Sequence, residues 1–227
     1  MRTRSPLLLL LALLGLLAGA CAGDGELGGP SVGGTPAAVV GDHVVSNADL
    51  ADETERWASN PAMLQGIGLQ DIGTPGRRTT SLVAFVLSHR IVSEQARLML
   101  ADARRRADRG EFDLAGAGVD GEALAEPSET EVDAVLEQLD QQFTGPDGVS
   151  VFRDFDEAFR RQLARDLAYQ ERLEQVLQLP LDAPEVSVNP RWGIVRELQG
   201  GIVQVVPPAG PVPSLGAAPG LTGNAAP

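Results

Sequence analysis

The stretch that decides how the chain closes is EVSVNPRWG, residues 185–193, near the C-terminal end of a 227-residue sequence. Val186 and Val188 alternate with polar residues, a pattern that is typical of a half-buried β-strand. A strand carries backbone donors and acceptors that need partners, so it cannot stand alone in water. The question is which other part of the chain pairs with it.

The other strand-like segments are AAVVGDHVVS, residues 37–46, and GIVQVV, residues 201–206. Gly41 and Asp42 separate two apolar runs, and both residues tolerate the left-handed conformation that a two-residue hairpin turn requires. We therefore predict one small sheet, in which residues 186–189 and 202–206 pair with residues 39–45. Such a sheet would be built from both ends of the chain.

Between these ends the sequence predicts helices. Ser46 caps a first helix, and residues 80–106 contain no glycine or proline and repeat apolar residues at helical spacing. A capping box at Ser128 begins a third helix, and Asp154 begins a fourth that stops before Pro180. Residues 63–78 are expected to form a loop with one helical turn. The predicted fold is mainly α, a four-helix cluster closed by the small sheet.

The N-terminal segment has the layout of a secretory signal peptide, residues 1–20. Arg2 and Arg4 precede a leucine-rich run, and small residues follow it. Cys21 is the only cysteine, and LLAGAC (residues 16–21) resembles a bacterial lipobox, although Ala18 stands where the usual motif has leucine. We expect Cys21 to be lipidated and to anchor the protein to the outer face of the cell membrane. The alternative is ordinary cleavage that leaves a free thiol.

Composition divides the rest of the chain into three parts. Residues 21–36 are rich in glycine and predict a flexible tether, and residues 207–227 form a tail of proline, alanine and glycine without charge. Residues 37–206 remain as a single domain, long enough to bury a core.

Charge and motifs exclude several classes of function. The chain has 31 acidic and 18 basic residues, a formal net charge of −13, which disfavours binding to nucleic acid. The only histidines, His43 and His89, have no metal-ligand spacing, so we expect no metal and no cofactor. All basic residues are arginine, which leaves no lysine for a phosphate-binding loop. No catalytic motif is present, and we expect the carboxylates to lie on solvated helix faces.

An aromatic stripe is the best candidate for binding extended peptides. Phe152, Phe155 and Phe159 follow one another near the start of the last helix, and Trp192 lies in the closing strand. Such residues either form part of the core or line an apolar groove for extended peptides, which accepts many side chains. The base rate for amphipathic helices favours the core.

The element order and four segments resemble the N-terminal chaperone domain of SurA-type and trigger-factor-like proteins. The segments are AAVVGDHVVSNADLADE, PSETEVDAVLEQL, FRDFDEAFRRQL and VSVNPRWG, the last being similar to the end of actinobacterial lipoproteins of this group. The resemblance implies a helical module that binds client proteins. Full-length members carry parvulin-type prolyl isomerase domains after the helical part, and the 50 residues that follow Leu177 leave no room for one.

Three functions follow in order of preference. The first is an exported, lipid-anchored chaperone-like protein that holds unfolded or emerging exported polypeptides without ATP. The second is an adaptor lipoprotein that binds one folded envelope partner through its acidic surface or its tail. The third, a peptidyl-prolyl isomerase, lacks a domain to carry the activity.

Overall fold

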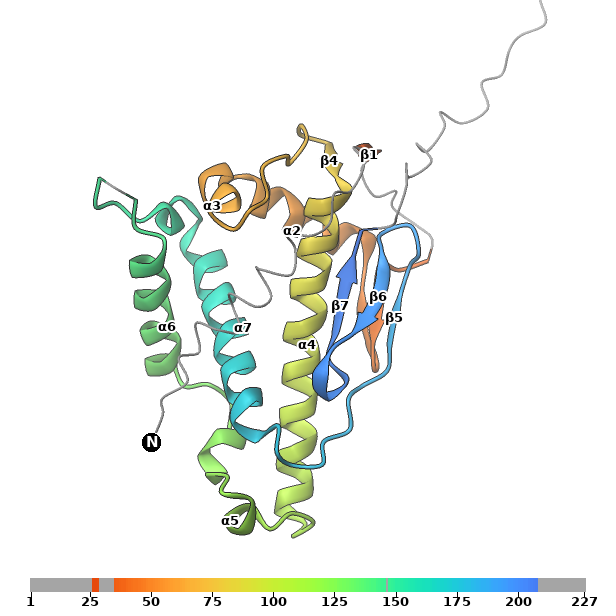
Figure 1. The fold of residues 1–227 in the computed structure, drawn as a ribbon, viewed down its shortest axis with the longest axis vertical. Coiled ribbons are helices and arrows are strands. Elements are labelled where there is room, and N and C mark those ends of the chain that lie inside the picture. Colours follow the sequence, from red (N-terminus) through yellow and green to blue (C-terminus); the bar gives the residue numbers. More distant parts are fainter. Residues whose placement is uncertain (1–25, 29–34, 146, 208–227) are drawn as a thin grey trace, which may run out of the picture.

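A computed structural model describes residues 26–28, 35–145 and 147–207. The protein is mainly helical with small antiparallel sheets (Figure 1). The expected signal peptide, Cys21 and residues 208–227 of the expected tail lie outside the described residues. The longer helices are α2 (Asn47–Ala58), α4 (Thr80–Asp108), α6 (Glu129–Gln142) and α7 (Glu157–Val176), and the shorter ones are α3 (Pro61–Gly66) and α5 (Leu114–Ala117).

The helix starts follow from side-chain caps. The Ser46 hydroxyl accepts a hydrogen bond from Asp49 N, and Ser128 forms a complete capping box with Glu131. The predicted start of the last helix at Asp154 is wrong. Val151–Asp154 form a 3₁₀ turn, η3, and Asp156 caps α7 by accepting from Phe159 N. Asp154 lies within this turn, whereas Asp156 has the extended backbone that a capping residue needs.

The strands form three small sheets instead of the single predicted one. β2 (Ala38–Val40) lies between β3 (His43–Val45) and β5 (Val186–Val188), and Gly41 takes a φ of 58° in the hairpin turn. β7 (Val203–Val206) pairs with β6 (Ile194–Glu197), which the sequence analysis did not anticipate. These two strands form a hairpin of their own, whose loop is closed by a bond from Leu198 N to Ile202 O and contains Gly200 and Gly201, both with a φ of 75°.

The third sheet joins the expected tether to the expected loop. β1 (Glu26–Gly28) pairs antiparallel with β4 (Arg77–Thr79), directly before α4. The predicted single helical turn in the loop is α3, which Asn60 caps by accepting from Met63 N. The loop therefore contains more regular structure than its glycines indicated.

Helix α4 is the central element, and α2, α7, β2 and β7 all pack against it. Strand β7 lies along α4 and bonds to its side chains. Ser88 Oγ accepts from Val205 N at 3.2 Å, Gln95 Oε1 accepts from Val203 N at 3.0 Å, and Gln95 Nε2 donates to Gly201 O at 3.2 Å. These bonds give partners to the backbone N–H groups of Val203 and Val205, on the edge of β7 that faces away from β6.

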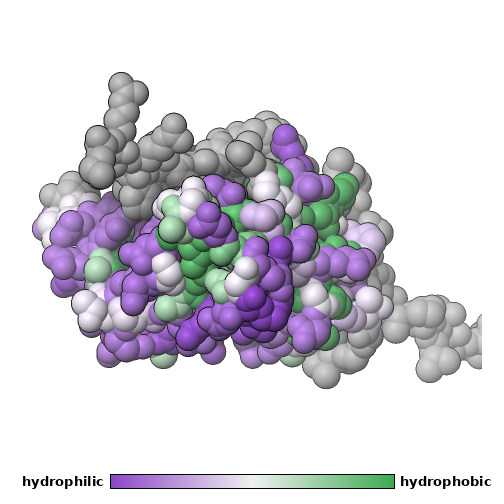
Figure 2. All heavy atoms as spheres, turned by 90° about the horizontal axis from the view of Figure 1, so that it is seen from below, coloured by the Kyte–Doolittle hydropathy of each residue, from purple (hydrophilic) through white to green (hydrophobic). Residues whose placement is uncertain are grey.

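Polar residues on α4 separate two apolar cores. The larger core contains Leu82–Leu87 side chains together with α2, α3, α6 and the start of α7, and the smaller core surrounds Met99 near the C-terminal end of α4. Between them lie the buried polar residues Ser88, Ser93, Glu94 and Gln95. Figure 2, which views the end that carries the smaller core, shows apolar residues among a mainly polar surface.

An arginine fastens the loop before α6 to α7. Arg172 is 8% exposed, donates to the carbonyls of Glu122 and Ala125, and forms two bonds of 2.7 Å to the Glu131 carboxylate. This arginine and the Ser128 bonds lower the pKa of Glu131 to about 2. One guanidinium therefore connects three segments, because its planar fork presents several donors.

Replacement of Gln95 by methionine is expected to lower the free energy of unfolding by about 2 kcal/mol, because the buried Val203 N and the partly buried Gly201 O would lose their partners. Urea unfolding measures this effect. The control is Gln141→Met on the exposed face of α6, where we expect a change within about 0.5 kcal/mol. Equal stability of the two variants would contradict the role of Gln95.

Replacement of Arg172 by methionine is expected to cost about 3 kcal/mol of unfolding free energy, since it removes the partner of a bonded carboxylate and of two carbonyls. Arg172→Lys keeps the charge without the fork, so an intermediate loss is expected in thermal and urea unfolding. Arg161→Met, which removes ion pairs to exposed Glu129 and Asp133, is the control and should cost less than about 1 kcal/mol. A lysine variant as stable as the wild type would contradict the need for the fork.

Candidate functional site

An apolar cavity of about 70 Å³ lies where helices α2, α3, α4, α6 and α7 meet. Three of its lining residues, His89, Phe143 and Leu167, are partly exposed, and the other lining residues are buried. Only four lining residues are polar, so a ligand here would be recognised mainly by apolar contact. The lining residues are Trp57, Met63, Ile67, Phe85, Ser88, His89, Leu139, Phe143, Phe152, Leu163, Leu167, Gln170 and Gln204.

A hydrogen-bonded bridge holds the upper wall of the cavity. Asn60 caps α3 with its side-chain oxygen, and its Nδ2 donates to Val151 O at 2.6 Å. This bond joins the start of α3 to η3, which places Met63 and Phe152 against the same cavity. Asn60 is 1% exposed, so the bridge is shielded from competing water.

The phenylalanine stripe meets in the larger core, around Trp57. Phe155 and Phe159 lie 5.7 Å from the Trp57 ring, edge to face, and 5.1 Å from each other. Phe152, Phe155 and Phe159 are each 4% exposed or less. Phe152 lines the cavity, whereas Phe155 and Phe159 pack behind its Trp57 wall, which is the core placement that the base rate for amphipathic helices favoured.

Trp192 is also buried, at 2% exposure, and it is not among the residues that line the cavity. Its indole nitrogen donates to Asn47 Oδ1 at 2.9 Å, and the Arg191 guanidinium stacks 4.6 Å from its ring. Asn47 begins α2, so this contact fastens the C-terminal segment to the first helix. The burial and bonding of Trp192 give it a structural role.

A charged junction lies beside the cavity, where α2, α4 and α7 meet. It consists of Glu53, His89, Arg90 and Asp166. Glu53 is 8% exposed, and its two carboxylate oxygens lie 3.9 Å from His89 Nδ1 and 3.9 Å from Arg90 Nη1. Buried atoms Glu53 Oε1, His89 Nδ1 and Asp166 Oδ2 have no hydrogen-bond partner in the described structure. Unpartnered polar atoms at such depth are uncommon and call for an explanation.

Burial shifts the pKa of Asp166, Glu53 and His89. It raises the pKa of the Asp166 carboxyl to about 7, with Glu53 adding to the rise and Arg90 opposing it. It also raises the pKa of Glu53, again against the effect of Arg90. Burial, together with Arg90, lowers the pKa of His89 to about 4, so this histidine is neutral at pH 7. The junction thus has two carboxyl groups and one nearby guanidinium, Arg90.

Sequence analysis did not single out this junction, because it assigned the carboxylates to solvated faces. That assignment is wrong for Glu53 and Asp166. A signal was present, since Glu53 follows Leu50 by three residues and precedes Trp57 by four, and therefore lies on the apolar face of its helix. Asp166 similarly lies next to Leu163 and Leu167 on α7. His43, by contrast, is partly exposed and lies 3.6 Å from Glu94.

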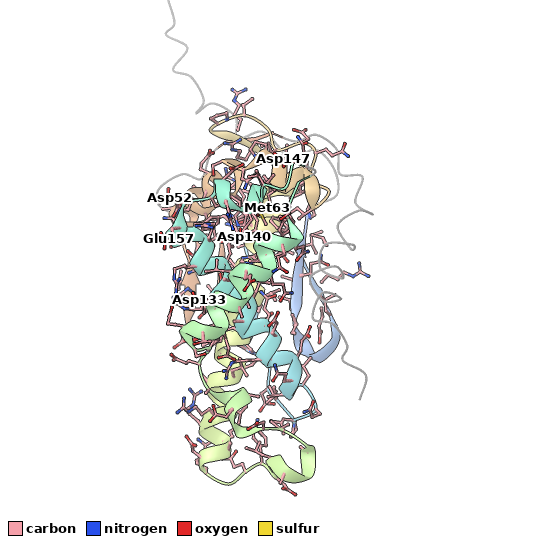
Figure 3. The ribbon with its side chains drawn as sticks, turned by 90° about the vertical axis from the view of Figure 1, so that its left-hand side faces the viewer. Asp52, Met63, Asp133, Asp140, Asp147 and Glu157 are labelled. Atoms are coloured by element: carbon pink, nitrogen blue, oxygen red, sulfur yellow. The ribbon has the colours of Figure 1, made fainter. Side chains whose placement is uncertain are left out.

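Several acidic residues lie on the side of the molecule that carries α6. Figure 3 shows Asp133, Asp140 and Asp147 on the same side as Met63, which lines the cavity. Asp133 and Asp140 pair with Arg161 and Arg153, so these carboxylates are partly neutralised. Within the residues that the structure describes, no helix is long and apolar enough to cross a membrane.

Replacement of Asp166 by asparagine is expected to stabilise the protein above pH 7 and to have little effect near pH 4. In the wild type the unfolded carboxyl loses its proton near pH 4, whereas the folded one keeps it up to about pH 7. Stability is therefore lost as the pH rises between these values, and the asparagine variant should gain up to about 4 kcal/mol at high pH.

Urea unfolding at several pH values measures this gain. The matched control is Asp133→Asn on α6, whose carboxylate is largely exposed and paired with Arg161. It should keep the pH dependence of the wild type. An Asp166→Asn gain of equal size at low and high pH would show that the carboxyl does not titrate in this range.

Comparisons of the chain with models of protein families, with curated proteins and with solved structures find no match. The function is therefore inferred from the cavity and the charged junction.

Proposed function

We propose that the protein is an exported, lipid-anchored chaperone-like module that holds unfolded polypeptides without ATP. The observation that supports this proposal is the apolar cavity, whose partly exposed residues Phe143 and Leu167 give an approach for a client side chain. Cys21 would carry the lipid anchor and keep the domain at the outer face of the cell membrane. No metal, nucleotide or other cofactor is needed for such binding.

The size and lining of the cavity fit one apolar side chain of a client. A cavity of about 70 Å³ is roughly half the volume of an engineered 150 Å³ cavity that binds benzene, so a branched aliphatic group suits it better than a large ring. Apolar walls with few polar partners discriminate weakly between such side chains, which is the property that a holdase requires. The rest of the client would remain outside the cavity.

The acidic surroundings favour clients that carry basic residues near their apolar ones. The chain has a net charge of −13, and Asp133, Asp140 and Asp147 lie on the side of the molecule that carries α6. The assignment to a SurA-like N-terminal domain is part of the same proposal, and the mainly helical fold with small antiparallel sheets is compatible with it.

A second candidate is an adaptor that binds one folded envelope partner. Ile194 and Val195 on β6 favour it, because they are 54% and 37% exposed on a strand whose side chains all face solvent. Exposed apolar residues on such a strand suit contact with another protein. A single stoichiometric partner lost on Ile194→Asp, with unfolded-client binding absent, would favour the adaptor.

The test is binding of the full chain to a permanently unfolded reporter protein, followed by fluorescence anisotropy and by light scattering. We expect saturable binding and suppressed aggregation. Phe143→Trp, which fills the cavity, and Leu167→Glu, which puts a charge at its rim, should each weaken binding at least about tenfold, equivalent to about 1.4 kcal/mol. Both variants are checked for native circular dichroism.

The control is Val44→Asp, because Val44 is a 54% exposed apolar residue on β3 that does not line the cavity. It should bind the reporter as the wild type does. Unchanged reporter binding by folded Phe143→Trp and Leu167→Glu would place the client elsewhere, and no binding by the wild type would refute the holdase proposal.

A further inference from the structure

We propose that the charged junction of Glu53, His89, Arg90 and Asp166 is a proton-controlled latch on the apolar cavity. With a proton on Asp166, α2 stays packed on α7 and the cavity is closed. Loss of that proton separates α2 from α7 and opens the cavity to apolar ligands. This inference concerns regulation of the cavity and rests on the proposed function for its biological meaning.

The junction is in direct contact with the cavity wall. His89 lines the cavity with its ring, and its Nδ1 faces Glu53 Oε1 at 3.9 Å. Trp57, another wall residue, packs edge to face on His89 with 5.5 Å between ring centroids. A movement at the junction therefore shifts two side chains that shape the cavity.

The same wall depends on contacts between α2 and α7. Trp57 of α2 meets Phe159 of α7 at 5.7 Å, and the Arg56 guanidinium lies 5.8 Å from the Phe159 ring. These are contacts between side chains of two helices, with no hydrogen bond among them. Repulsion between Glu53 and Asp166, one on each helix, acts directly against this packing.

The charges that face the two carboxyl groups are insufficient to hold both ionised. Around Asp166 lie Glu53 from α2, Arg90 and Glu94 from α4, and Arg165 from α7 itself, which is engaged with Glu129 of α6 at 2.7 Å. Glu53 is further faced by Asp49 and Arg56 of its own helix, besides Arg90 and His89. His89 is neutral at pH 7 and adds no positive charge. Arg90 is therefore the main cation shared by both carboxyl groups.

A polar recess provides the route for water once the proton leaves. It has a volume of about 160 Å³ and lies between α2, α4 and α7. An ionised carboxylate gains hydration that the closed junction denies it, so water entry favours the separated arrangement. The recess is lined by Asp49, Asp52, Glu53, Arg56, Arg90 and Gln162.

The experiment titrates the full chain with 1-anilinonaphthalene-8-sulfonate, a fluorescent apolar probe, between about pH 6 and about pH 8. The wild type should bind the probe several-fold more tightly at the higher pH, with far-ultraviolet circular dichroism unchanged. Asp166→Asn should stay at the low-pH affinity throughout. Asp133→Asn, on the exposed face of α6, should follow the wild type.

Two outcomes overturn the latch. One is a probe affinity that does not rise with pH in the wild type, and the other is a rise that persists in Asp166→Asn. Binding of the unfolded reporter, measured at both pH values, separates this inference from the proposed function. Reporter binding that is equal at both pH values refutes the latch and leaves the holdase, whereas the expected probe profile without reporter binding leaves the latch and refutes the holdase.

Discussion

The rest of the structure depends on the burial of α4. This helix has 29 residues, and 17 of them are buried because other elements pack around it. Polar side chains in the buried part of this helix cannot bond to water, so they need partners from other elements. Ser88 and Gln95 bond to β7, and Ser93 accepts from Gln170 of α7 at 3.0 Å. These bonds determine where the neighbours of α4 lie.

The functional features occur where this pairing is incomplete. His89 and Glu53 face each other at the limit of an ion pair, and Asp166 approaches from the third helix without a bonded partner. Beside them the apolar side chains leave a cavity that they do not fill. Natural proteins tend to depart from full packing and full polar satisfaction at sites of function. The coincidence of an unfilled cavity with buried polar atoms that have no hydrogen-bond partner is what makes this region the candidate site.

Local signals predicted the helices well, since caps and apolar periodicity are properties of neighbouring residues. The capping box at Ser128 and the glycine-free run before Arg106 both correspond to helices with these features. Strand pairing was harder, because β2 pairs with β5 across most of the chain and β7 pairs with β6, a strand that the sequence did not predict. The cavity could not be predicted, as its lining residues come from five helices and β7.

The pairing of β5 with β2 has a consequence for the order in which the molecule is made. Trp192 bonds to Asn47 across 145 positions of sequence, and Val186–Val188 completes a sheet begun at Ala38. A ribosome must therefore release almost the entire domain before its sheet can close, and until then the hairpin of β2 and β3 has an open edge. Contacts of such long range slow folding and lengthen the life of incomplete states. A newly made chain is therefore incompletely folded for a time, and this is the state that we propose it binds in other proteins.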